Sequence, residues 1–184
     1  IGAPCVEGRR SRDGLPRAVV LRGAPGFGKS SLAEWLCQRA HEVGAATVIK
    51  ATHSPTPTPR DGLAPALGRF HGCDELPRST IVDRMVRVVD DLAPDAPARI
   101  TEVAHQLAAF IVSGRGDDFG ARMTRDQKYM VLAEHLRRLG RHRPVVLWID
   151  DAQWSDESLE FGRRLLERAD DVRALLVYTV RTEQ

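Results

Sequence analysis

Cysteine and histidine are scarce in this sequence of 184 residues. The three cysteines are odd in number, lie far apart and form no CxxC pair, which argues against a disulfide framework and against a zinc site. The six histidines are scattered, and the HGC stretch at 71–73 lacks the further ligands that a metal site needs. We therefore expect reduced thiols, and histidines on the surface or in loops.

Long apolar runs and an excess of one charge are missing as well. No apolar run approaches the roughly 18 residues of a membrane-spanning helix, and the opening IGAPCVEGRR does not resemble a signal peptide. The net charge is only +2, and the basic stretch 136–144 has no interleaved aromatic residues, so it is more typical of an exposed helix end than of a nucleic-acid surface. We expect a cytoplasmic location, no membrane partner and no contact between this domain and DNA.

What the chain does contain is enough for one globular domain over 1–184. Hydrophobic residues make up 42% and charged residues 28%, which is the ordinary range of a folded protein. The chain does not begin with methionine and ends four residues past a strand-like run. We therefore expect a fragment of a longer protein.

Apolar runs alternate with stretches of helical spacing. Ser155 can cap a helix between the last two of these runs. Strands that alternate with helices predict an α/β fold in which a parallel sheet is covered by helices on both faces. The core strands are predicted at about 18–22, 45–51, 145–149 and 172–180.

The segments between these strands are predicted to be helical. The apolar residues after the first strand recur at helical spacing, and this helix should stop at Gly44. The middle of the chain, about 60–140, is mostly helical. There, Pro97 can begin one helix, 114–120 is a loop, and a capping box at residue 124 begins a helix that should stop at Gly140.

Glycines lie between the first strand and the first helix, in the stretch VVLRGAPGFGKSSLAEWL. Residues 23–30 match the phosphate-loop pattern G-x-x-x-x-G-K-[ST] in the strand–helix context that it requires. Lys29 would bridge the β- and γ-phosphates of ATP, Ser30 would coordinate Mg²⁺, and Ser31 would reach the α-phosphate. The alternative is a glycine-rich turn with a surface lysine. The predicted nucleotide-binding residues are Gly23, Ala24, Pro25, Gly26, Phe27, Gly28, Lys29, Ser30 and Ser31.

Two aspartates end the apolar run VVLWID. This is the Walker B pattern, in which Asp150 would hold Mg²⁺ through its water shell. Asp151 would face the γ-phosphate and polarise the attacking water. Ligands of a parallel sheet gather at the carboxyl ends of its strands, where both motifs fall. The alternative is a pair of solvated loop aspartates.

Polar residues also end the last predicted strand. Thr179 and Arg181 lie at its carboxyl end, on the same edge of the sheet as the two motifs. A polar group there can touch the γ-phosphate or the water, so Arg181 joins Lys29 and Asp151 as a candidate catalytic residue. The alternative is a surface arginine in an arginine-rich chain.

Three stretches resemble the ATPase domains of STAND proteins, the AAA+-like signal-transduction ATPases with numerous domains. They are LRGAPGFGKSSLAEWL, VVLWIDDAQWSDESLEF and LLVYTVRTE. Bacterial members fused to transcription regulators, cyclases and kinases have a similar DD-x-x-W-x-D-x-x-S-L run. Its residues in this chain are Asp150, Asp151, Trp154, Asp156, Ser158 and Leu159.

The resemblance implies a three-layer P-loop NTPase fold, here truncated before its fifth strand and lid. The strand at 172–180 should lie between the phosphate-loop strand and the strand at 145–149. The implied function is an ATP/ADP switch with Mg²⁺, which controls attached effector and sensor domains of the same polypeptide and a nucleotide-dependent homo-oligomer. AAA+ motors usually carry glutamate where this chain has Asp151, so slow turnover is expected.

Three other functions fit the same motifs. An AAA+ ATPase of the origin-recognition kind would use ATP to close around DNA, with a steep dependence of binding on salt. A P-loop kinase would pass the γ-phosphate to a small molecule and would need that acceptor for turnover. A nucleotide-dependent interaction module would hydrolyse ATP negligibly and retain ADP.

Overall fold

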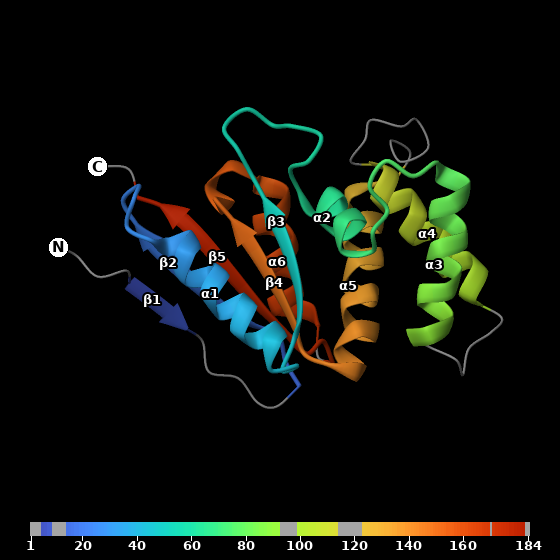
Figure 1. Ribbon diagram of the computed structural model, residues 1–184, viewed down its shortest axis with the longest axis horizontal. Coiled ribbons are helices and arrows are strands. Elements are labelled where there is room, and N and C mark those ends of the chain that lie inside the picture. Colours follow the sequence, from blue (N-terminus) through green and yellow to red (C-terminus); the bar gives the residue numbers. More distant parts are fainter. Residues whose placement is uncertain (1–4, 9–13, 93–98, 114–122, 170, 183–184) are drawn as a thin grey trace.

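A five-stranded sheet organises the chain (Figure 1). The computed structural model describes residues 5–8, 14–92, 99–113, 123–169 and 171–182. Within these ranges the strand order is β1-β2-β5-β4-β3, with β1 antiparallel to β2 and every other pair of neighbours parallel. The strands are β1 (Cys5–Gly8), β2 (Arg17–Gly23), β3 (Thr47–Thr52), β4 (Val145–Asp150) and β5 (Ala174–Arg181).

The predicted parallel α/β sheet is confirmed, including the position of β5 between β2 and β4. β3 begins two residues later than predicted because the preceding backbone completes the end of the first helix: the N–H groups of Ala45 and Ala46 both donate to Ala40 O, at 2.9 and 3.3 Å. β1 was not predicted. It pairs with the outer edge of β2, from Cys5 opposite Arg22 to Gly8 opposite Val19.

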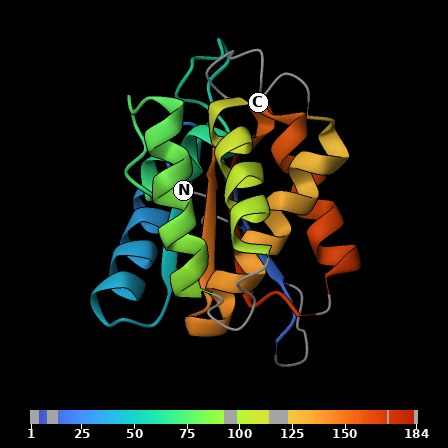
Figure 2. The ribbon, with the colours of Figure 1, turned by 90° about the vertical axis from the view of Figure 1, so that its right-hand side faces the viewer.

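Helices cover both faces of the sheet. α1 lies on one face, and α6 lies on the other together with the helical segment α2–α5 (Figure 1). α3 and α4 lie side by side at the end of the molecule remote from β1, as both ribbon views show (Figures 1 and 2). Among the described residues, no helix combines the length and the apolar character needed to cross a bilayer. The helices are α1 (Lys29–Glu42), α2 (Leu63–Phe70), α3 (Arg78–Leu92), α4 (Ile100–Ser113), α5 (Arg125–His142) and α6 (Asp156–Arg168), with a short 3₁₀ turn, η3 (Ala152–Trp154).

The helix boundaries follow the predicted caps with one exception. Thr124 forms the predicted capping box, and Ser155 caps α6 through its hydroxyl. The predicted stop of α5 at Gly140 was wrong, because the helix continues to His142. A Cβ at Gly140 would lie 3.3 Å from the backbone nitrogen of Arg173, so this glycine allows a close approach and does not end the helix. The predicted start at Pro97 and the loop 114–120 lie outside the described residues.

α1 packs on the sheet through small side chains. Ala33 and Cys37 are buried against Trp148 of β4, whose large ring leaves little room beneath the helix. The helical spacing of apolar residues therefore located α1 but did not identify its buried side. Four larger apolar residues of α1 and its C-cap are exposed: Leu32, Trp35, Leu36 and Val43.

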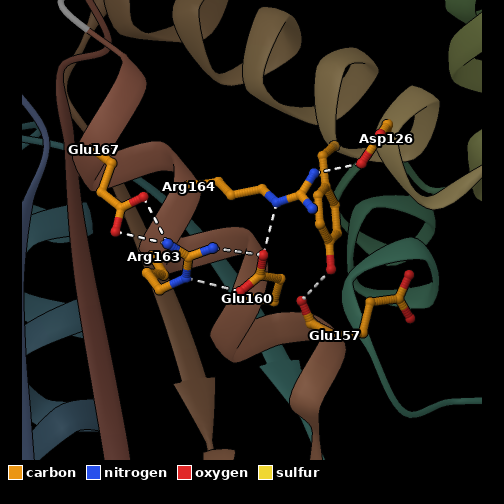
Figure 3. Close-up of polar contacts among 7 residues, drawn as sticks. Asp126, Glu157, Glu160, Arg163, Arg164 and Glu167 are labelled. Carbon is orange, nitrogen blue, oxygen red and sulfur yellow. Dashed lines mark hydrogen bonds and ion pairs between the residues drawn. The ribbon is translucent and has the colours of Figure 1, made fainter.

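α6 is fastened to α5 by a network of polar contacts (Figure 3). Arg164 donates to Glu160 at 2.8 Å and forms an ion pair with Asp126 at the start of α5. Its guanidinium also lies over the ring of Tyr129, whose hydroxyl donates to the carbonyl of Glu157 at 3.0 Å. Each exposed ion pair stabilises the fold only slightly, because water screens it, but together these contacts hold α6, the helix that follows the two aspartates, against α5.

Two histidines meet inside the helical layer. His71, at the end of α2, and His135, in the middle of α5, place their Nε2 atoms 2.8 Å apart. His135 is 1% exposed and lies within α5, so the expectation of surface or loop positions was wrong for this histidine. Among the described residues, no group of three or more histidine, cysteine or acidic side chains could hold a metal ion. The pair is therefore a buried structural contact between α2 and α5.

Acid should destabilise the fold through this pair. Burial lowers the pKa of His71 to about 4 and that of His135 to about 3, from an ordinary value of 6.5, and nearby positive charges act in the same direction. Between about pH 6.5 and 4 the unfolded chain binds protons that the folded chain does not, so the free energy of unfolding falls as the pH falls. The expected slope is up to about 1.4 kcal/mol per pH unit for each histidine.

Urea unfolding at several pH values checks this slope. His135→Phe should make the decline between pH 6.5 and 4 about half as steep. His105→Gln, a change at an exposed histidine, should leave the slope as it is in the unmodified chain. An unchanged slope in His135→Phe would contradict the assignment.

Candidate functional site

The loop between β2 and α1 leads into a helix whose first N–H groups lack a helical partner. Gly26 and Gly28 have φ of 83° and 73°, in the left-handed region that glycine adopts without strain. The first helical bond of α1 runs from the N–H of Leu32 to the carbonyl of Gly28 at 2.9 Å, so the N–H groups before Leu32 have no partner within the helix. No side chain caps this end of α1 among the described residues. The loop can therefore cradle an anion.

Lys29 is buried beside the loop and forms a hydrogen bond with it. The residue is 6% exposed, and its Nζ donates to the carbonyl of Ala24 at 2.8 Å. Lys29 lines a cavity of about 320 Å³, and Asp151 and Arg181 line the same cavity. Phe27, also predicted to bind nucleotide, is 46% exposed and is not among the residues that line this cavity. The loop and helix residues that line the cavity are Pro25, Gly26, Gly28, Lys29, Ser30 and Ser31.

Ser30 and Asp150 come together as a pair of oxygen ligands. The Ser30 hydroxyl donates to Asp150 Oδ1 at 2.8 Å, although the two residues are 120 positions apart in the chain. A hydroxyl and a carboxylate are the kinds of ligand that Mg²⁺ prefers, and Ser30 lines the cavity together with Lys29, Asp151 and Arg181. The predicted metal ligands therefore fit a magnesium ion.

Thr179 joins the two aspartates, a role that the sequence analysis did not predict. Its hydroxyl donates to Asp150 Oδ1 at 2.6 Å and accepts the backbone N–H of Asp151 at 2.9 Å. The residue is fully buried. The Thr179 hydroxyl therefore orients the two aspartates. Thr179 is not among the residues that line the cavity, so its contacts do not support the expected contact with a nucleotide.

Asp151 is held in an unusual conformation and in an ion pair. Its φ of 52° lies in the left-handed region, which is uncommon for a residue with a side chain. Arg181 at the end of β5 contacts both carboxylate oxygens, through Nε to Oδ1 at 2.9 Å and through Nη2 to Oδ2. Arg181 is thus a wall of the cavity, even though its side chain is 46% exposed.

Gln153 completes the arrangement, and no pattern in the sequence pointed to it. Its Nε2 donates to Asp151 Oδ1 at 3.3 Å, and its Oε1 accepts the backbone N–H of Arg181 at 3.2 Å. The short η3 turn aims this side chain back at β5. Gln153 therefore fastens the two charged residues to each other.

The charges around Asp151 keep it ionised. Burial raises the pKa of its carboxyl, but the hydrogen bonds from Arg181 and Gln153 and the charges of Arg181 and Lys29 outweigh burial and hold the pKa below its ordinary value. The same pairing raises the pKa of Arg181. Neither aspartate is a freely solvated loop residue, because both are half-buried and hydrogen-bonded.

All these groups lie at the carboxyl ends of neighbouring parallel strands. The loop follows β2, the aspartates follow β4, and Arg181 ends β5, which runs between them. Such an edge is where ligands of open α/β sheets bind. The structure therefore brings together the residues that the sequence pattern selected from three distant stretches.

Comparison with known proteins agrees with this arrangement. A family model described as AAA ATPase domain matches residues 7–178, which include the phosphate loop and both aspartates. Neither the curated proteins nor the solved structures yielded a match. The family is one of ATPase-type nucleotide binding, and its members bind ATP or ADP with Mg²⁺. Because the match spans most of its length, the chain belongs to the AAA ATPase domain family.

Proposed function

We propose that this chain binds Mg-ATP in the cavity between the phosphate loop and Arg181 and hydrolyses it slowly to ADP and phosphate. The observation that carries the proposal is the contact of Ser30 with Asp150 at 2.8 Å, which joins the loop to the acidic strand end. This hydrogen bond joins the loop that would hold the phosphates to the carboxylate that would hold their metal.

The residues divide the work as follows. The loop N–H groups and the Lys29 ammonium bind the phosphates, while Ser30 and Asp150 hold the metal. A bound Mg²⁺ would supply positive charge against the phosphates. Asp151, kept ionised by its neighbours, accepts a proton from the attacking water. The water oxygen bonds to the terminal phosphorus while the bond from that phosphorus to the bridging oxygen breaks, which gives ADP and phosphate.

The slow turnover and the regulatory role belong to the proposal as well. Asp151 is a short carboxylate, and its two oxygens are both engaged by Arg181, so it is a poorer base than a free glutamate. With slow hydrolysis, the ATP-bound and ADP-bound states each last long enough to control other domains. We infer that these states control attached effector and sensor domains and a homo-oligomer in the cytoplasm, as the resemblance to STAND proteins suggests.

A second candidate function is an interaction module that binds nucleotide with negligible hydrolysis. The ion pair between Asp151 and Arg181 favours it, because the only carboxylate proposed as the base is bound by a cation. Phosphate release under saturating ATP separates the two functions.

Calorimetry of the folded chain with ATP and Mg²⁺ tests the proposal. We expect one nucleotide bound per chain, weaker binding when the metal is chelated, and phosphate release slower than the roughly 10 s⁻¹ typical of enzymes. Phosphate release should still exceed the rate without protein; release at that background rate would favour the interaction module. Absence of any heat from folded protein would contradict nucleotide binding itself.

A further inference from the structure

We propose that a second cavity, between α4 and α5, binds a small carboxylic acid whose apolar body fills the cavity and whose carboxylate contacts the arginines that line it. Among the described residues, no side chain lines both this cavity and the one beside Lys29. The inference therefore goes beyond the proposed function and does not depend on it.

One side of each helix lines the cavity. On α4 the lining residues include Val103, Gln106 and Ala109, and on α5 they include Gln127 and Val131. Each set has the spacing of three or four residues that places side chains on one side of a helix. The cavity has a volume of about 670 Å³. Small organic ligands occupy cavities of about 300 to 1,000 Å³, so the space fits a ligand of that class.

Apolar side chains form a large part of the lining. They are Val103, Ala109, Met123, Met130 and Val131. Met130 is 69% exposed, although large apolar side chains are usually buried. The flexible methionine side chain adapts to ligands of different shape. An occupant with an apolar body would remove this surface from water, which favours its binding.

The charges that line the cavity select an acid among apolar ligands. Arg99, Arg137 and Arg138 line it, and among the residues that the structure describes Glu134 is the one acidic residue of the lining. Burial raises the pKa of Glu134, but the hydrogen bonds and charges of Arg137 and Arg138 outweigh burial and lower it, so Glu134 is ionised. Even when Asp171, 3.5 Å from Arg137, is counted, positive charge exceeds negative charge here.

Arg138 has donors left for a ligand. Its Nε donates to Glu134 at 2.7 Å, and within the described part of the chain its Nη atoms form no hydrogen bond. The side chain is only 11% exposed, although the sequence suggested an exposed helix end at 136–144. A half-buried guanidinium with unpaired N–H groups binds a carboxylate through short, charge-assisted hydrogen bonds. The arginine therefore supplies the contact that a neutral ligand would lack.

NMR of the methionine methyl groups, with octanoate as the probe, tests the site. The chain has three methionines: Met123 and Met130 line the cavity, whereas Met85 is fully buried in α3. Octanoate should shift the signals of Met123 and Met130 and leave that of Met85, with half-saturation at about 1 mM or less. Octan-1-ol, which has the same chain without the charge, should bind about tenfold more weakly.

Substitutions on the two helices test the arginines. Arg138→Gln should weaken octanoate binding by about tenfold and change the binding of octan-1-ol little. Lys128→Gln removes the same charge from α5 at a residue outside the lining and should change neither. Arg99→Gln, at an exposed residue, gives the same test if Arg138→Gln does not fold. Met130→Glu adds a negative charge at an exposed position of the lining and should weaken octanoate binding by at least about tenfold.

Several outcomes would overturn the inference. Equal affinities for octanoate and octan-1-ol, or unchanged octanoate binding in folded arginine variants, would mean that the arginines do not select the ligand. No shift of Met123 and Met130 up to about 10 mM octanoate, or an equal shift of Met85, would mean that the cavity is not the site. A sedimentation experiment in which the unmodified chain is a dimer and Met130→Glu a monomer would assign this face to a second copy of the chain.

The same samples separate this inference from the proposed function. A chain that binds octanoate in the cavity but shows no heat with Mg-ATP would contradict the proposed function alone. A chain that binds Mg-ATP but gives no methionine shift with octanoate would contradict this inference alone.

Discussion

Lys29→Ala is expected to weaken binding of Mg-ATP by roughly 100-fold, which calorimetry or a fluorescent analogue measures directly. A buried, charged donor contributes up to about 3 kcal/mol to its hydrogen bonds, and 1.4 kcal/mol is a factor of ten in affinity. Lys29 is 6% exposed, so water does not replace it easily. Its partner in the structure is Ala24 O at 2.8 Å, within the loop itself, and a phosphate can take over that bond.

Two further variants make the result specific to the loop. Lys128→Ala removes another of the three lysines, on α5 and away from the cavity, and should bind ATP as the unmodified chain does. Lys29→Met keeps the length of the side chain without its charge and should lose as much affinity as the alanine variant. If Lys29→Ala is folded and binds ATP normally, the loop does not hold the phosphates.

The elements that local chemistry determines could be predicted from the sequence. Gly28 adopts the left-handed conformation just before a helix begins. This geometry depends only on residues that are close in the sequence, so the phosphate loop can be predicted from a single short stretch. Buried parallel strands such as β4 are continuous apolar runs for the same reason. The strand order depends on connections between strands that are far apart in the sequence, so no short stretch predicts it. It could be expected only from the resemblance to a known fold.

Contacts between distant stretches could not be predicted. Thr179 reaches both aspartates only because its side of β5 faces the tip of β4 in this register. Gln153 depends on the direction of a three-residue turn. The partnership of His71 and His135 depends on how α2 packs on α5. Each of these residues has an unremarkable sequence context, and its role arises from packing.

The buried side of α1 could not be predicted for a different reason. Apolar spacing predicts that large residues face the core, but the space under α1 is filled from the sheet by Trp148, which is 2% exposed. Lys50 of β3 adds its ammonium over the same ring, 3.7 Å from the ring centroid. Periodicity identifies a helix, whereas the volume available beneath it decides which side is buried.

Asp151→Asn is expected to reduce ATP turnover by about 100-fold or more while ATP remains bound. An amide cannot take the proton of the attacking water, but it preserves the shape of the side chain and can still accept hydrogen bonds from Gln153 and Arg181. Because the hydrogen bonds and charges around Asp151 hold its pKa below the ordinary value, the unmodified carboxylate is ionised at neutral pH. The loss should therefore appear in kcat and not in KM.

Single-turnover phosphate release, measured alongside binding, distinguishes this role from a structural one. Asp151→Glu restores a carboxylate at the position where AAA+ motors usually carry glutamate, and it should keep measurable turnover. Asp126→Asn removes a carboxylate from an exposed ion pair with Arg164 and should leave turnover unchanged. If Asp151→Asn binds ATP and releases phosphate at the unmodified rate, the water is activated by another group. In that event Asp151 serves only as the counter-ion of Arg181, and hydrolysis must be traced to a different residue on this edge of the sheet.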